Sequence, residues 1–138
     1  MPSLAIAVTV LDHLESKTMQ KHLLIIEDDL EISELFQIIF ELEAYCTTFC
    51  SIAPDPAFIN DLNVHLIIMD IRLVGSKYNG AELCQMFKLQ YPQNKTPVLL
   101  VSAEADGNIL ASKYGADGFM YKPFNIDDLL QRVAEMVA

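Results

Sequence analysis

Four short apolar runs along the chain each end in polar residues. Runs of this length that do not alternate with polar residues are typical of strands buried on both faces of a parallel sheet. The runs, with the polar residues that end them, are 23–26 before Glu27, Asp28 and Asp29; 65–69 before Asp70; 98–101 before Ser102; and 119–121 before Lys122. Parallel strands end along one edge of a sheet, where α/β proteins bind ligands. We therefore expect these polar side chains to converge on one site.

Strand and helix patterns alternate from residue 21 to the end of the chain. Helical spacing of apolar residues and residues typical of helix starts predict a helix after each strand. The expected strands cover 21–27, 45–50, 65–70, 97–102 and 118–121, and the expected helices cover 30–42, 56–63, 80–90, 104–114 and 126–138. This (βα)5 alternation predicts an α/β fold with a doubly wound, parallel, five-stranded sheet in the flavodoxin-like order 2-1-3-4-5.

The helix patterns also predict caps and inward faces. Asp28 or Asp29 is the expected N-cap of the first helix, and Asn125 is the expected N-cap of the last one. The apolar residues at helical spacing in the first helix are Leu30, Leu35, Ile38, Ile39 and Leu42. In the last helix, the residues expected to face inward are Leu129, Leu130, Val133 and Met136.

The chain has 138 residues, which suits one domain over 21–138. Residues 1–20 supply no strand that the sheet needs. They form an N-terminal extension, interpreted either as the product of an upstream start codon or as a short helix packed on the domain. With 19 acidic and 9 basic residues, the net charge of −10 argues against direct nucleic-acid binding and an electrostatic membrane anchor. No run approaches the ~20 apolar residues of a membrane span, and we expect a cytoplasmic protein.

The polar groups at the strand ends are suited to phosphoryl chemistry. A carboxylate such as Asp70 can act as a nucleophile on phosphorus if a metal and a fixed cation offset the repulsion between the two anions. Mg²⁺ prefers hard oxygen ligands, which Glu27, Asp28 and Asp29 can supply. Lys122 offers a positive charge, and Ser102 a hydroxyl, to the phosphoryl oxygens.

The segments LLIIEDD, LIIMD, VLLVSA and GADGFMYKPF occur in the order found in one family. From residue 21 to 138, the chain resembles a receiver domain of a two-component response regulator. The resemblance implies that Asp70 accepts a phosphoryl group from a phosphohistidine of a sensor histidine kinase or phosphotransfer protein. It implies self-catalysed phosphotransfer and slow autodephosphorylation rather than multiple-turnover catalysis. A homodimer or a downstream protein target is the expected route of output.

The resemblance also assigns site residues. Asp28, Asp70 and the backbone carbonyl of Arg72 would bind Mg²⁺ directly, and Glu27 would act through water. Ser102 and Lys122 would bind the phosphoryl oxygens. Phe119, three residues before Lys122, stands where the family has its switch aromatic, so Ser102 and Phe119 are the expected switch pair.

Two departures from the family pattern concern the loop over 71–80. The family commonly has a proline four residues after the phosphorylated Asp and a glycine eight residues after it. Here the fourth residue is Val74, and Gly80 lies ten residues after Asp70. The longer loop is expected to modulate phosphoryl lifetime or partner choice. Arg72 and Glu104 could additionally form an ion pair that shields the phosphoryl group from water.

Two other functions compete with a phosphorylated receiver. One is a receiver-like module that is not phosphorylated and acts through protein contacts, which would normally lack an acid or the lysine of the site. The other is a phosphatase of the haloacid dehalogenase kind. That family usually requires Asp-x-Asp, whereas this chain reads Asp70-Ile71-Arg72.

Overall fold

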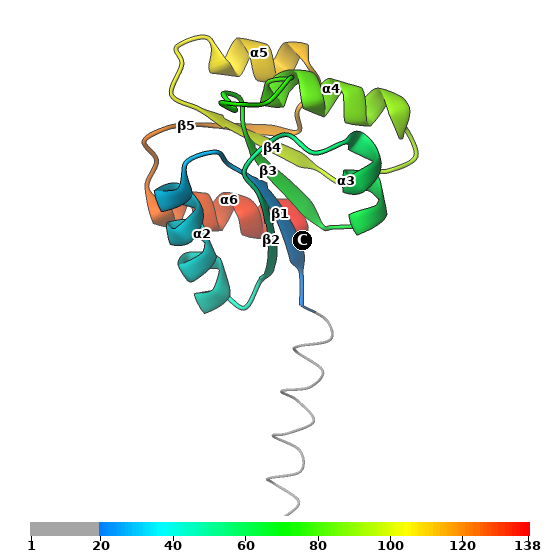
Figure 1. The fold of residues 1–138 in the computed structure, drawn as a ribbon. Helices are drawn as coiled ribbons and strands as arrows, with labels where there is room; N and C mark the ends of the chain where they lie inside the picture. Colours follow the sequence, from blue (N-terminus) through cyan, green and yellow to red (C-terminus); the bar gives the residue numbers. More distant parts are fainter. Residues whose placement is uncertain (1–19) are drawn as a thin grey trace, which may run out of the picture.

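The computed structural model describes residues 20–138. The alternatives for the N-terminal extension therefore fall, except for Gln20, on residues outside the described part of the chain. Elements are labelled as in Figure 1. The strands are β1 (His22–Ile26), β2 (Cys46–Cys50), β3 (Leu66–Asp70), β4 (Val98–Ser102) and β5 (Gly118–Tyr121). The helices are α2 (Leu30–Leu42), α3 (Pro56–Leu62), α4 (Gly80–Gln90), α5 (Gly107–Lys113) and α6 (Ile126–Val137).

The five strands form one parallel sheet in the order β2-β1-β3-β4-β5, which confirms the predicted topology. The chain reverses direction across the sheet between β1 and β3, and β3 lies at the centre. In the register of the sheet, Asp70 pairs with Val101 and Ser102 pairs with Tyr121. The ends of β1, β3, β4 and β5 therefore lie along the same edge.

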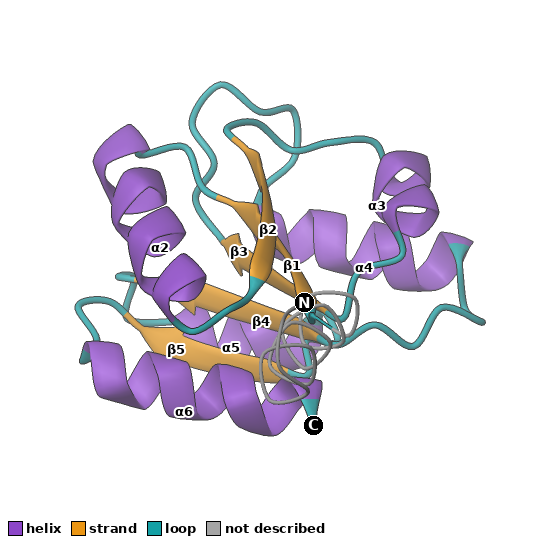
Figure 2. Ribbon diagram, turned by 90° about the horizontal axis from the view of Figure 1, so that it is seen from below, coloured by secondary structure: helices purple, strands orange, loops and turns teal. Residues whose placement is uncertain are grey.

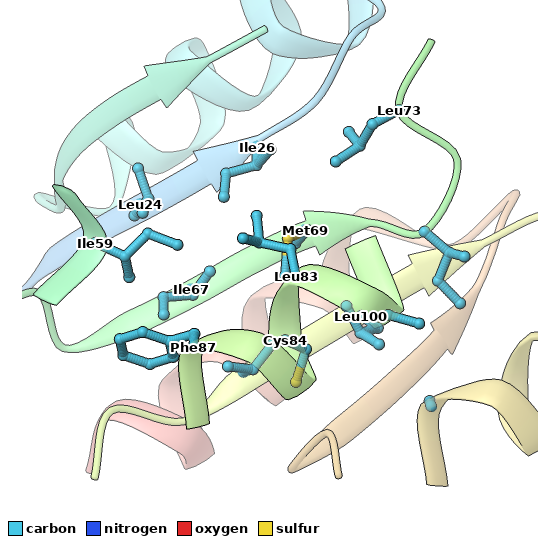
Figure 3. Close-up of a cluster of buried hydrophobic side chains, with 14 of the residues drawn as sticks. Leu24, Ile26, Ile59, Ile67, Met69, Leu73, Leu83, Cys84, Phe87 and Leu100 are labelled. Carbon is cyan, nitrogen blue, oxygen red and sulfur yellow. The ribbon is translucent and has the colours of Figure 1, made fainter. Parts of the chain in front are cut away.

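Helices cover both faces of the sheet. Figures 1 and 2 show α3, α4 and α5 on one side and α2 and α6 on the other. On the first side, Ile59, Leu83 and Phe87 from the helices pack over Ile67 and other strand residues. In Figure 3, Leu83, Cys84 and Phe87 of α4 lie over this face. Successive side chains of each strand point alternately into the hydrophobic cores on the two faces of the sheet. This explains the unbroken apolar runs in the sequence.

Helix α2 presents a different face to the core from the one that apolar spacing predicted. Its buried residues are Phe36 and Phe40. The Phe36 ring stacks on Phe124 at 6.0 Å between centroids, and Phe40 meets Tyr45 edge-on at 5.9 Å. Aromatic rings bury more apolar area than aliphatic side chains, so they take the interior positions. Of the apolar residues at helical spacing, Ile39 packs against the core, whereas Leu30, Leu35, Ile38 and Leu42 are exposed. In α6, by contrast, Leu129 and Val133 are buried as predicted.

Two helices start at their predicted capping residues, and a third helix starts later than predicted. Asp29 caps α2 by accepting hydrogen bonds from the backbone N–H groups of Glu31 and Ile32, and Asn125 caps α6. Helix α5 begins at Gly107 rather than at 104. The Ser102 hydroxyl accepts the N–H of Glu104 at 3.0 Å, and this side-chain bond favours a turn over a helix. Among the helices of residues 20–138, none is long and apolar enough to cross a membrane.

Candidate functional site

Three carboxylates meet at the carboxyl edge of the sheet. Glu27 and Asp28 follow β1, and Asp70 is the last residue of β3. One ligand oxygen from each lies within 4.8 Å of the others. Glu27 and Asp70 are buried, and Asp28 is half-buried. Asp29 is turned instead to its capping role in α2, so it does not join the cluster as the sequence had allowed.

Lys122, which directly follows β5, contacts two of these acids. Its ammonium lies 2.7 Å from Oδ2 of Asp70 and 3.0 Å from Oε2 of Glu27. The backbone N–H of Lys122 donates to the carbonyl of Ser102 at 2.9 Å, which fixes the residue at the end of β5. The sheet thus brings a cation from position 122 into direct contact with acids from positions 27 and 70, as the strand-end pattern predicted.

The electrostatics of the cluster follow from its burial. Burial raises the pKa of Glu27 from 4.5 to about 7, while the hydrogen bond from Lys122 opposes the rise and the charge of Asp70 adds to it. For Lys122, burial works to lower the pKa, but the hydrogen bonds to Asp70 and Glu27 outweigh it and raise the pKa above the ordinary value. Lys122 is therefore a firmly charged group, whereas burial disfavours the charged form of Glu27.

Both carboxylate oxygens of Asp70 have a partner. Oδ2 accepts from Lys122, and Oδ1 accepts from the backbone N–H of Arg72 at 3.2 Å. The side chain is largely covered, with Asp70 8% exposed. These contacts hold the carboxylate in one orientation at the mouth of the site. Arg72 is thereby placed beside Asp70, while the role of its carbonyl as a metal ligand stays a prediction.

Ser102 and Phe119, the expected switch pair, both lie against the first residue of α5. Ser102 is buried and Phe119 is half-buried. Between them stands Gly107, the first residue of α5: an added Cβ there would lie 2.6 Å from Cζ of Phe119 and 3.1 Å from Cβ of Ser102. Tyr121 packs edge-on against Phe119 at 4.7 Å between centroids and donates its hydroxyl to the carbonyl of Ala105 at 3.2 Å.

The longer loop over 71–80 is folded back onto the site. The Gly80 N–H donates to the carbonyl of Ile71 at 2.7 Å, which closes the base of the loop. An added Cβ at Gly80 would overlap the carbonyl oxygen of Asp70, so only glycine fits this close approach of α4 to β3. A cavity of about 320 Å³ lies between this loop and α5, lined by Arg72, Lys77 and Glu104 among others.

Arg72 and Glu104 share this cavity but do not form the expected ion pair. Within residues 20–138, the ion pairs join Lys122 to Glu27 and Asp70, and Lys88 to Asp117. Both Arg72 and Glu104 are exposed. Two long, solvated side chains gain little from pairing and lose rotamer freedom, which accounts for their separation.

Two contacts of the site were not predicted. The backbone N–H of Val74 donates to Oδ2 of Asp28 at 3.1 Å, across 46 residues of sequence. Gly107 makes room for the Phe119 ring. The substitution of Val for the family's usual proline was a signal for the first contact, because only a non-proline residue has the N–H. For Gly107, the signal was a glycine close to the predicted start of a helix, where a side chain is otherwise expected.

The donor set fits a hard divalent cation. Carboxylate oxygens are the ligands that Mg²⁺ prefers, and it commonly takes one or two of them while keeping waters. Glu27, Asp28 and Asp70 offer three such groups, with one oxygen of each within 4.8 Å of the others. Burial raises the pKa of Glu27, and the neighbouring charge of Asp70 adds to the rise.

Comparison with known proteins matches the chain to one family. The family model described as the response regulator receiver domain matches residues 23–134. The nitrogen assimilation regulatory protein NtrX of Azorhizobium caulinodans is 37% identical over 117 residues, covering 81% of this chain and 25% of that protein. A probable transcriptional regulatory protein of Picosynechococcus sp. is 31% identical over 120 residues, covering 80% of this chain and 46% of that protein. The chain thus spans less than half the length of these curated relatives.

Solved structures show the same architecture. The crystal structure of the receiver domain of NtrX from Brucella abortus is similar with a TM-score of 0.73 and 30% identity, covering 83% of this chain and 97% of that one. The BeF3-activated receiver domain of RstA from Klebsiella pneumoniae has a TM-score of 0.75 at 22% identity, covering 85% of this chain and 98% of that one. At that identity the second likeness supports the fold alone.

Proposed function

The chain belongs to the response regulator receiver domain family, and on that premise we propose that Asp70 is its phosphoacceptor. The observation that carries the proposal is the contact of the Lys122 ammonium with Asp70 at 2.7 Å, beside the cluster of Asp70 with Glu27 and Asp28. A nucleophilic carboxylate, a fixed cation and an oxygen-rich cation site are the parts that phosphoryl transfer to a carboxylate needs. A receiver-like module without phosphorylation has no need to keep all of them.

In the proposed transfer, a carboxylate oxygen of Asp70 attacks the phosphorus of a phosphohistidine on a sensor histidine kinase or phosphotransfer protein. The new P–O bond forms as the P–N bond breaks, and the imidazole nitrogen keeps the electron pair and takes up a proton from water. Lys122 lies within reach of the incoming phosphoryl oxygens, and its charge offsets theirs. Ser102 donates its hydroxyl to another of these oxygens after releasing the N–H of Glu104.

Asp28 and Asp70, with the Arg72 carbonyl, are the proposed Mg²⁺ ligands, and Glu27 is the proposed partner of a metal-bound water. When bound, the metal supplies charge neutralisation and orientation for the phosphoryl oxygens. The residues' own contribution is to hold the carboxylates together at the sheet edge. Lys122 offsets part of the negative charge of Glu27 and Asp70, and a bound metal would offset more of it.

Incubation with acetyl phosphate tests the proposal. Intact-mass spectrometry should show one added phosphoryl group on the wild-type chain in Mg²⁺ and none in EDTA. Asp70→Asn should abolish the adduct, because an amide is a poor nucleophile. Asp61→Asn, which changes an exposed acid on α3, is the matched control and should be labelled like the wild type. Equal labelling of Asp70→Asn and wild type would refute the assignment.

A further inference from the structure

We propose that Val74 is a positioning residue for the metal site, acting through its backbone N–H on the carboxylate of Asp28. This inference rests on the proposed function, since it takes Asp28 as a Mg²⁺ ligand. The N–H of Val74 lies 3.1 Å from Oδ2 of Asp28, and the side chain of Val74 points to solvent with 62% exposure. The contribution of this residue to the site is therefore made by the main chain.

The Val74 N–H is held in place by the residues around it. Leu73, 6% exposed, belongs to the same core cluster as Ile26 and Met69 and anchors the start of the loop (Figure 3). After it, the Ser76 N–H donates to the Leu73 carbonyl at 3.2 Å, and Gly75 has φ +84°. A closed turn with positive φ at its third position has the signature of type II. Val74 is the second residue of this turn, so its N–H is rigidly placed.

A second hydrogen bond fastens the other end of the turn. The hydroxyl of Ser76 accepts the backbone N–H of Ala53 at 2.8 Å, which ties the loop to the segment after β2. The turn is thus secured at Leu73 by burial and at Ser76 by a hydrogen bond. The donor at position 74 is preorganised toward Asp28 rather than brought there by the carboxylate.

The bond matters because Asp28 is the least constrained acid of the cluster. Glu27 is held by Lys122 and by the N–H of Asp29, and Asp70 by Lys122 and the N–H of Arg72. Asp28 is half-buried, and among the described residues its side chain has the Val74 N–H as its hydrogen-bond partner. Without that donor, repulsion from the neighbouring carboxylates favours rotation of Asp28 into solvent. Partners of this kind orient metal ligands and sustain affinity.

Position 74 accepts a substitution that removes the backbone N–H. Proline is favoured at the second position of type II turns, so Val74→Pro is compatible with the turn; it removes the N–H and replaces an exposed side chain. Val74→Ala is the matched control, because it keeps the N–H and alters an exposed side chain. Since the family commonly has proline at this position, the hydrogen bond is a feature of this chain rather than of the general receiver pattern.

Calorimetric titration with MgCl₂, paired with thermal unfolding in EDTA, tests the inference. Val74→Pro should bind Mg²⁺ about tenfold more weakly than wild type, while its unfolding temperature in EDTA stays close to that of wild type. Val74→Ala should match the wild type in both measurements. Equal Mg²⁺ affinity of Val74→Pro and wild type overturns the role of Val74 and leaves the proposed function standing. Absence of Mg²⁺ binding by the wild type overturns both.

An NMR titration of the wild-type chain keeps the inference testable if Val74→Pro does not fold. The amide resonance of Val74 should shift as Mg²⁺ is added, with the same midpoint as that of Arg72. A Val74 resonance that stays in place while Arg72 shifts would overturn the coupling.

Discussion

Gly107 stands directly against the Phe119 ring, so close that a Cβ at position 107 would lie 2.6 Å from Cζ of the ring. The same Cβ would lie 3.1 Å from Cβ of Ser102. The first turn of α5, the proposed switch aromatic and the proposed phosphoryl-binding hydroxyl are therefore packed as one unit. A movement of any one of the three requires space from the other two.

Gly107→Ala should destabilise the protein by about 1 kcal/mol. Alanine gains at most ~1 kcal/mol over glycine in a helix, whereas overpacking typically costs about 1–3 kcal/mol. Urea unfolding measures the difference. In a Phe119→Ala background the clash with the ring is absent and only the contact with Ser102 remains, so the same substitution should cost less there. An equal penalty in both backgrounds would show that the ring does not limit position 107.

Lys122→Ala should leave Mg²⁺ affinity intact or slightly increased, because the ammonium competes with the metal for Glu27 and Asp70. It should abolish the conformational change induced by beryllofluoride, since the charge that binds the phosphoryl oxygens is gone. Mg²⁺ titration and beryllofluoride-induced spectral shifts separate the two effects. Lys88→Ala, which removes the exposed pair with Asp117, is the control and should change neither. A large loss of Mg²⁺ affinity in Lys122→Ala would contradict this role.

Beryllofluoride with Mg²⁺ should alter hydrogen exchange over residues 102–121. Asp106 makes no side-chain cap at the start of α5, and the helix has only 7 residues, so this segment has low local stability. Recruitment of the Ser102 hydroxyl to a phosphoryl-like group would release the N–H of Glu104. Exchange rates that stay the same in this segment, with changes elsewhere, would place the switch in another part of the fold.

Arg72→Ala and Glu104→Ala should each speed dephosphorylation, and their effects should multiply in the double variant. The two side chains line one cavity but form no ion pair in the described chain, so each covers the site independently. Decay of the phosphorylated protein, followed by intact mass, measures the rates. A double variant no faster than either single one would mean that the two residues act as a pair once Asp70 is phosphorylated.

The fold and the acids of the site were predictable because one signal encodes both. Each buried strand reads as an unbroken apolar run, and its polar end residue marks the edge at which strands meet. The order of the strands in the sheet then determines which strand ends are neighbours. For this reason the sequence predicted that Glu27, Asp28, Asp70 and Lys122 lie close together. The structure places them in one cluster.

The sequence pattern could not predict which side chains take the buried positions of a helix, or which backbone N–H groups bind a side chain. Helix α2 has apolar residues on more than one side, so the spacing of apolar residues alone could not show that Phe36 and Phe40 are the buried ones. The start of α5 was set by the Ser102 hydroxyl bonding the backbone of Glu104, a tertiary detail of one turn. Almost every residue has a backbone N–H, so the sequence does not single out that of Val74. Its contact with Asp28 depends on the path of the loop, which the sequence pattern does not give.

The position of the phosphoryl group distinguishes Asp70 from the other acids of the site. The protein phosphorylated by acetyl phosphate in Mg²⁺ is reduced with borohydride, which converts an acyl phosphate carbon to an alcohol, and its peptides are then sequenced by mass spectrometry. The modified residue should lie at position 70, and the carboxylates at positions 27 and 28 should be unmodified. Modification at another acid, with Asp70 intact, would contradict the assignment of Asp70.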